Sequence, residues 1–147
     1  MSKSKRQTQR LWLLGAFIVL IYGASHYQPD NTDEVAQQTS PIAELFQQKR
    51  SDVLVEISGE VSRLFADDNR GSRHQRFLVE LADGHTLLIA HNIDLAPRVE
   101  NLEIGDEISL FGEYEWNDKG GVVHWTHHDP ANKHPHGWIR HQGKLYQ

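Results

Sequence analysis

The sequence has no cysteine, and its one methionine is the first residue. The lack of thiols excludes a disulfide framework, a thiolate nucleophile, a cysteine-type zinc site and a lipid-modified cysteine anchor. The lack of internal methionine excludes thioether ligation of copper(I). Basic residues are also scarce after residue 25, where 11 lysines and arginines stand against 20 acidic residues. A chain this acidic is not expected to cover duplex-DNA phosphates with a broad basic face.

The first 25 residues have the pattern of an export signal. Residues 1–10 are polar and basic, residues 11–22 (LWLLGAFIVLIY) are apolar throughout, and the small residues Gly23-Ala24-Ser25 follow. This pattern is typical of a secretory signal cleaved before His26, or of an uncleaved anchor that holds residues 11–25 in the inner membrane. The apolar run is shorter than the ~20 residues that comfortably span a bilayer, so both alternatives stay open. Either one predicts a periplasmic or extracytoplasmic location for the rest of the chain.

Residues 26–40 are polar and are predicted to be a flexible linker, which leaves residues 41–147 as one domain. Ser40-Pro41 has the pattern of a helix cap followed by proline at the first helical position. Apolar residues then follow at the spacing of one helix face, at Ile42, Leu45 and Phe46. They predict a short helix that ends near Arg50 and packs on the domain.

From Val53 the apolar period changes to two, as in half-buried strands. Five strands are predicted: a long one from residue 53 with a bend or bulge at Gly59, then residues 72–81, 85–91, 104–116 and 122–128. A long bent first strand, with an irregular segment between the third and fourth, predicts an all-β fold, a small five-stranded OB-fold-like barrel. A generic small β-sandwich is the alternative.

Hairpin register predicts which side chains meet. With Asp83-Gly84 as a two-residue loop, Arg76 faces His91 across the second and third strands. The start of one strand and the end of the other then form one cluster, comprising Arg73, His74, Arg76, His91, Asn92 and Asp94. In OB-folds these strands and the loop between the first two form the usual ligand face.

The next hairpin is predicted to have a four-residue loop over residues 118–121, with Glu115 facing His124. One face then holds Tyr114, Trp116, Val123, Trp125 and His127, and the other holds Glu113, Glu115, His124, Thr126 and His128. An odd-length loop would exchange the two faces.

Six of the ten histidines lie between His124 and His141, where the chain leaves the last strand at Asp129-Pro130. Imidazole is the commonest protein ligand for metals. A divalent metal, zinc or magnesium, is predicted to bind His127, His128, Asp129 and His134, although their spacing matches no standard motif. The alternative is that several are surface or cross-strand histidines, with His124 paired to Glu115 or Glu113.

Four stretches carry a family resemblance: SRHQRF at 72–77, TLLIAHNIDLAPR at 86–98, GEYEWNDKGGVVHWTHHDP at 112–130 and HPHGWIRHQGKLYQ at 134–147. In them the chain resembles a bacterial family of unknown function, DUF3465, over roughly residues 53–147. The resemblance implies a small exported β-domain that includes the histidine-rich tail. It implies no activity.

The leading hypothesis is a site for a phosphate-bearing ligand, with nucleic acid as the first candidate. The protein would hydrolyse this ligand as a metal-dependent nuclease or phosphodiesterase. His91 or His74 would act as general base, beside Arg76 and Asp94. Ligand contacts are predicted from Arg73, Asn92, Arg98 and Trp125. This geometry requires the tail to fold back over the cluster and bring its imidazoles to the arginines. The alternatives are a non-catalytic module that binds nucleic acid or glycan, and a histidine-rich metal-binding protein. The oligomeric state is not predicted.

Overall fold

The computed structural model describes residues 40–147. The predicted signal or anchor segment and nearly all of the predicted linker, residues 1–39, lie outside the described residues. Among the described helices, none is long and apolar enough to cross a membrane.

Helix α2 (Pro41–Gln47) opens the described part of the chain. Ser40 caps it by accepting a hydrogen bond from the backbone N–H of Ala43 at 3.2 Å. Ile42 and Leu45 are buried in the domain core. Phe46 stacks on Trp116, whose indole N–H donates to the Phe46 carbonyl at 3.1 Å. The helix expected after Ser40 is therefore present and packs on the domain, but it ends earlier than predicted.

Five strands close into a barrel. Strand β1 (Val53–Leu64) pairs antiparallel with β2 (His74–Glu80) and with β4 (Glu107–Glu115), and β2 pairs with β3 (Thr86–Asn92). Strand β5 (Val122–His124) runs parallel to β3 and antiparallel to β4, which completes the ring. The order β1-β2-β3-β5-β4-β1 is that of an OB-type barrel, as predicted. Continuous pairing around the ring does not fit the sandwich alternative.

The core fills this barrel with every second residue of the strands, as the period of two predicts. Buried side chains include Val55, Ile57, Val61, Phe77, Val79, Leu87, Ile89, Leu110, Tyr114 and Val123. The irregular segment between β3 and β4 adds Val99 and Leu102. The chain approaches closely at Gly59, where a Cβ atom would clash with the Glu80 carbonyl. The register shift of β1 lies further on, between Val61 and Arg63, and not at Gly59.

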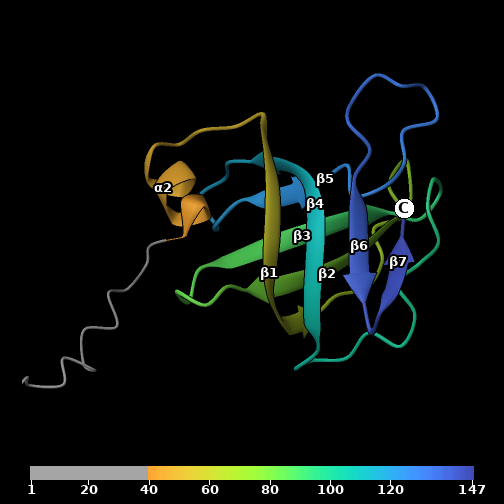
Figure 1. The fold of residues 1–147 in the computed structure, drawn as a ribbon, viewed down its shortest axis with the longest axis horizontal. Helices are drawn as coiled ribbons and strands as arrows, with labels where there is room; N and C mark the ends of the chain where they lie inside the picture. The colour runs from red at the N-terminus through yellow and green to blue at the C-terminus, as the bar shows by residue number, and fades with distance from the viewer. Residues whose placement is uncertain (1–39) are drawn as a thin grey trace, which may run out of the picture. The chain divides into compact units, whose positions relative to one another are not determined.

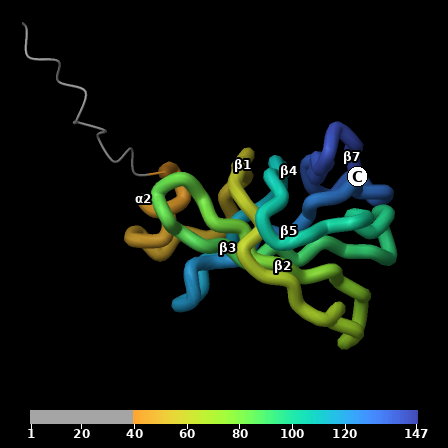
Figure 2. Tube along the Cα trace, turned by 90° about the horizontal axis from the view of Figure 1, so that it is seen from below, coloured from red at the N-terminus to blue at the C-terminus, as the bar shows by residue number. Residues whose placement is uncertain are grey.

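Two more strands follow β5. Strand β6 (Trp138–His141) pairs with β4, and β7 (Lys144–Tyr146) pairs with β6. Glu113 pairs with His124, and Phe111 pairs with Trp138. An unbroken partner strand would place residue 126 opposite Phe111, so 12 extra residues are inserted between β5 and β6 along the same edge of β4. We call residues 125–137 the tail loop. It projects beyond the barrel, and α2 and β7 lie on opposite sides of the barrel in both views (Figures 1 and 2).

The predicted register of the β2–β3 hairpin is wrong by one residue. Leu81 and His85 are the innermost bonded pair, so the loop has three residues, and its last, Gly84, has a φ of 81°. A three-residue loop ending in a left-handed glycine is a common hairpin type. Arg76 therefore faces Ala90, and His91 faces Gln75.

The predicted loop of the β4–β5 hairpin is two residues too short, because Glu113 and not Glu115 faces His124. An even shift keeps every side chain on its face. Tyr114 and Val123 accordingly point into the core, while Glu113, Glu115 and His124 share the outer face. The grouping fails after His124, where Trp125 adopts a φ of 53° and the strand ends.

Candidate functional site

The predicted cluster at the start of β2 and the end of β3 partly assembles. His74 pairs with Asn92, and the side-chain oxygen of Asn92 accepts a hydrogen bond from the Asp94 N–H at 2.9 Å. Arg73 donates to the Asp94 carboxylate from its backbone (2.8 Å) and its guanidinium (2.7 Å). These hydrogen bonds from Arg73 hold the pKa of Asp94 below its usual value. Four predicted site residues thus lie together; Arg73, Asn92 and Asp94 are linked through Asp94, while the ring of His74 bonds to the Ser72 carbonyl at 2.8 Å.

The other two arginines are tied to the loop between β1 and β2. Arg98 contacts both carboxylate oxygens of Asp67, with the shortest distance 2.7 Å. Arg76 donates to the Ala66 carbonyl at 3.1 and 3.3 Å. Both arginines therefore hold the loop between β1 and β2 in place. A phosphate group would have to displace Asp67 or the Ala66 carbonyl to bind them.

His91 does not have the surroundings of a surface base. Its side chain is fully buried. Nε2 lies 3.0 Å from the Pro97 carbonyl, which can only accept, so Nε2 carries the proton and Nδ1 accepts from the Thr126 hydroxyl at 2.9 Å. Burial lowers the pKa of His91 to about 4. The neutral ring is a core group with both nitrogens engaged, whereas the predicted general base must reach a substrate.

The tail loop is folded on its own side chains. The rings of Trp125 and His134 stack with centroids 4.1 Å apart, which occupies one face of a predicted ligand-binding aromatic. Asp129 is buried and accepts from the backbone N–H groups of Ala131, Lys133 and His134. Burial alone would raise the pKa of Asp129, but these hydrogen bonds lower it to about 2. The carboxylate is therefore the internal anchor of the loop.

The four predicted metal ligands lie near one another in the tail loop, but their ligand atoms do not converge on one point. Nδ1 of His127 lies 2.8 Å from the His128 carbonyl, His128 stacks on His136, and Nε2 of His134 lies 3.9 Å from Asp129. In the described part of the chain, the metal-compatible group whose ligand atoms all lie within 4.8 Å is a different one, Glu113, Glu115 and His124. The tail loop contacts β3 through the Thr126 hydroxyl, which bonds to His91. Among the described residues, no tail imidazole is bonded to Arg73, Arg76 or Arg98, as the predicted folding-back of the tail would require.

A groove that was not predicted lies beside Arg76 and Arg98. We call it the Phe65 groove. It has a volume of about 400 Å³ and is lined by Leu64, Phe65, Gln75, Arg76, Arg98, Val99, Glu100, Asn101 and Leu102. Phe65 is 38% exposed, and the guanidinium carbons of Arg63 and Arg76 lie 5.5 and 6.0 Å from its ring centroid. A large apolar residue near the end of the long first strand was the available signal, but the exposure of its side chain cannot be read from periodicity.

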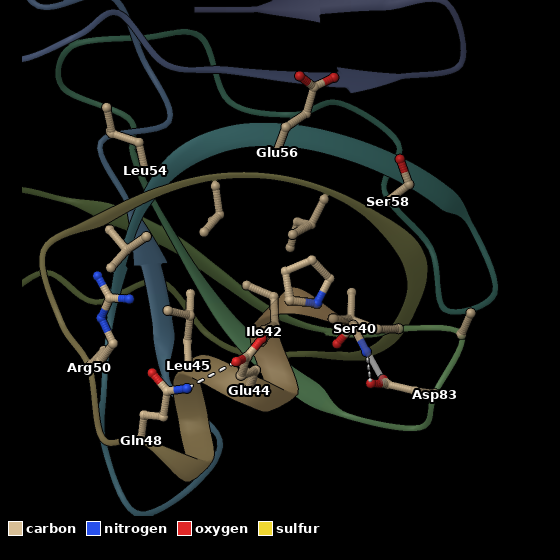
Figure 3. A pocket seen from close by; sticks show the side chains of 16 residues that line it. Ser40, Ile42, Glu44, Leu45, Gln48, Arg50, Leu54, Glu56, Ser58 and Asp83 are labelled. Carbon is tan, nitrogen blue, oxygen red and sulfur yellow. Dashed lines mark hydrogen bonds between the residues drawn. The ribbon is translucent and has the colours of Figure 1, made fainter. Parts of the chain in front are cut away.

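A larger pocket of about 570 Å³ lies between α2 and β1 (Figure 3). Its lining includes Ile42, Leu45 and Val55 and none of the predicted site residues. Polar groups at its edge bond to each other, Gln48 to Glu44 and the Ser40 N–H to Asp83 (Figure 3). The lining thus offers mainly apolar surface.

The closed barrel and its loop-lined groove define a small OB-type domain. The chain belongs to the family described as "Protein of unknown function (DUF3465)", whose model matches residues 25–147. The predicted family is confirmed, and the match begins well before residue 53. A search of curated proteins found no match. Among solved structures, a small single-stranded DNA-binding protein from Streptomyces coelicolor is similar over 63% of this chain and 94% of that chain, with 16% identity and a TM-score of 0.39.

Proposed function

We propose that this domain is a non-catalytic module that binds single-stranded nucleic acid at the Phe65 groove. The observation that carries the proposal is an exposed aromatic ring flanked by two guanidinium groups at the edge of a groove. Proteins that bind single strands combine stacking aromatics with cations that follow the phosphates. In OB-type barrels, the face of β2 and β3 and the loop before β2 bind oligonucleotides.

Binding has more support than hydrolysis. The sequence-based nuclease or phosphodiesterase hypothesis needs a base that can reach a ligand, and His91 is buried with both nitrogens bonded. It also needs free phosphate clamps, whereas Arg73 and Arg98 are paired with aspartates. A bound base requires only the Phe65 ring and a nearby charge.

The surrounding charges favour weak binding, because few unpaired cations remain to contact phosphates. Asp67, Asp68 and Glu100 lie in or next to the groove region and offset its arginines. Arg63 is exposed and takes part in no ion pair among the described residues, so it is the most available cation. We expect a Kd in the range of about 10⁻⁴–10⁻⁶ M at physiological salt.

Replacing Phe65 by alanine is expected to weaken binding of a labelled single-stranded oligonucleotide of about 15 nucleotides by roughly 10-fold or more. Loss of one stacked base costs about 1–3 kcal/mol.

Arg63→Gln should reduce the salt dependence of binding, lowering the magnitude of the slope of log K against log salt by about 0.7. Fluorescence anisotropy at several salt concentrations measures both effects on the full chain.

Two matched variants serve as controls. Ile104→Ala removes another exposed apolar side chain (66% exposed), and Arg140→Gln removes another arginine that lies over an aromatic ring, that of Trp138. Both should bind like the unmodified chain. If Phe65→Ala binds the oligonucleotide as tightly as the unmodified chain, the Phe65 groove is not the binding site. If the chain binds a glycan and no oligonucleotide, the proposed ligand class is wrong. Metal-dependent cleavage that EDTA abolishes would restore the catalytic hypothesis.

A further inference from the structure

The outer face of β4 and β5 brings together two carboxylates and an imidazole. Glu113 and His124 are directly opposed across the two strands, and Glu115 follows two residues later on the same face. Opposed residues of neighbouring strands have Cβ atoms about 4.5–5.5 Å apart. The three ligand atoms accordingly lie within 4.8 Å of one another.

His124 contains an unusual polar atom. Its Nε2 is shielded from solvent and has no hydrogen-bond partner, the one such side-chain atom among the described residues. It points toward Oε1 of Glu113 at 3.6 Å and Oε1 of Glu115 at 3.9 Å, both too long for a hydrogen bond. A shielded nitrogen without a protein partner costs free energy unless a water molecule or an ion satisfies it.

We infer that Glu113, Glu115 and His124 form a binding site for one divalent transition-metal ion, represented by Zn²⁺. Ligand atoms bound to one tetrahedral zinc at about 2.0–2.2 Å lie about 3.3–3.6 Å from each other. The observed separations of 3.6 and 3.9 Å are close to this spacing, so an ion needs only small side-chain adjustments. One imidazole and two carboxylates suit zinc, while magnesium prefers oxygen ligands alone.

The position of this site gives the ion a structural effect. Strand β5 ends at His124, and the tail loop begins at the next residue, whose ring lies 5.1 Å from that of His124. A bound ion joins β4 to the last residue of β5 and neutralises two neighbouring carboxylates. It therefore holds the base of the tail loop. This inference does not depend on ligand binding at the Phe65 groove.

The test is isothermal titration of the metal-free full chain with ZnCl₂, together with thermal unfolding. One ion should bind per chain and raise Tm by about 5–10 °C at saturation. Glu113→Gln/Glu115→Gln should weaken zinc binding at least ~100-fold, since loss of even an indirect partner costs 10- to 100-fold. MgCl₂ should produce neither effect. If the double variant does not fold, Glu115→Gln alone, at a half-exposed position, should weaken binding at least ~10-fold.

The matched control is His127→Asn/His128→Asn, which removes two of the ligands predicted in the tail and leaves Glu113, Glu115 and His124 intact. It should retain one-to-one zinc binding. Zinc binding that survives the glutamine substitutions but is lost in this control would place the ion in the tail loop and overturn the inference. An unmodified chain that binds no zinc, or shows no rise in Tm, would overturn it as well.

Discussion

Replacing Gly137 by alanine is expected to lower the free energy of unfolding by about 3 kcal/mol or more. Gly137 closes the neck of the tail loop, where its N–H donates to the His127 carbonyl at 2.9 Å. A Cβ atom there would clash with the Trp125 carbonyl and lie 2.7 Å from the Phe111 carbonyl and 2.8 Å from Cα of Thr126. These are backbone atoms of β4 and of the first two residues of the tail loop, so no side-chain rotation relieves the clash. Denaturant titration followed by circular dichroism measures the change.

Gly143→Ala is the matched comparison. Gly143 has a φ of 77° in the turn between β6 and β7, but nothing lies within 4 Å of a Cβ atom at that position. Its substitution should cost only about 1 kcal/mol, the strain of a left-handed alanine. If Gly137→Ala costs no more than Gly143→Ala, the neck of the loop is deformable, and the tail loop is not a rigid insertion.

Much of the barrel could be predicted from local pattern, because strands with one buried face repeat every second residue. Val55, Ile57, Phe77 and Val79 are buried as expected. The same alternation indicates that the side chain of His91 is buried, because Leu87 and Ile89 point inward and His91 lies on the same face of β3. The chemistry of imidazole suggested a base, but its place in the alternation decided its burial.

The placement of the tail could not be predicted, because it depends on a distant strand edge. Strand β5 covers only one end of β4, and β6 occupies the remaining edge after 12 inserted residues. Nothing local to residues 125–137 specifies that pairing. The candidate metal site has the same origin: Glu113 and Glu115 were placed on one face with His124, yet the distance that makes them ligands follows from the exact register. That register depends on a loop length that the sequence only approximates.

Lowering the pH from about 7 to 4 is expected to destabilise the domain, with roughly 3 kcal/mol attributable to His91. Its pKa is about 4 in the fold, mainly because of burial, against an ordinary value of 6.5. The unfolded chain therefore takes up the proton first as the pH falls. The contribution is complete above about pH 6.5 and is lost progressively toward pH 4. His124, whose pKa is also lowered by burial, acts in the same direction. Denaturant titrations at several pH values measure the slope.

His91→Gln tests this assignment, since an amide can donate to the Pro97 carbonyl and accept from Thr126 without titrating. This variant should lose most of the slope between pH 6.5 and 4, whereas His128→Gln, at an exposed position, should keep it. The aspartates with lowered pKa values, Asp68, Asp83, Asp94, Asp106 and Asp129, lose their contribution mainly below about pH 4, because their folded pKa values lie below the ordinary 3.8. An unchanged slope in His91→Gln would therefore show that protons enter elsewhere, and that the ring linking β3 to the base of the tail loop is not the acid-sensitive group of the core.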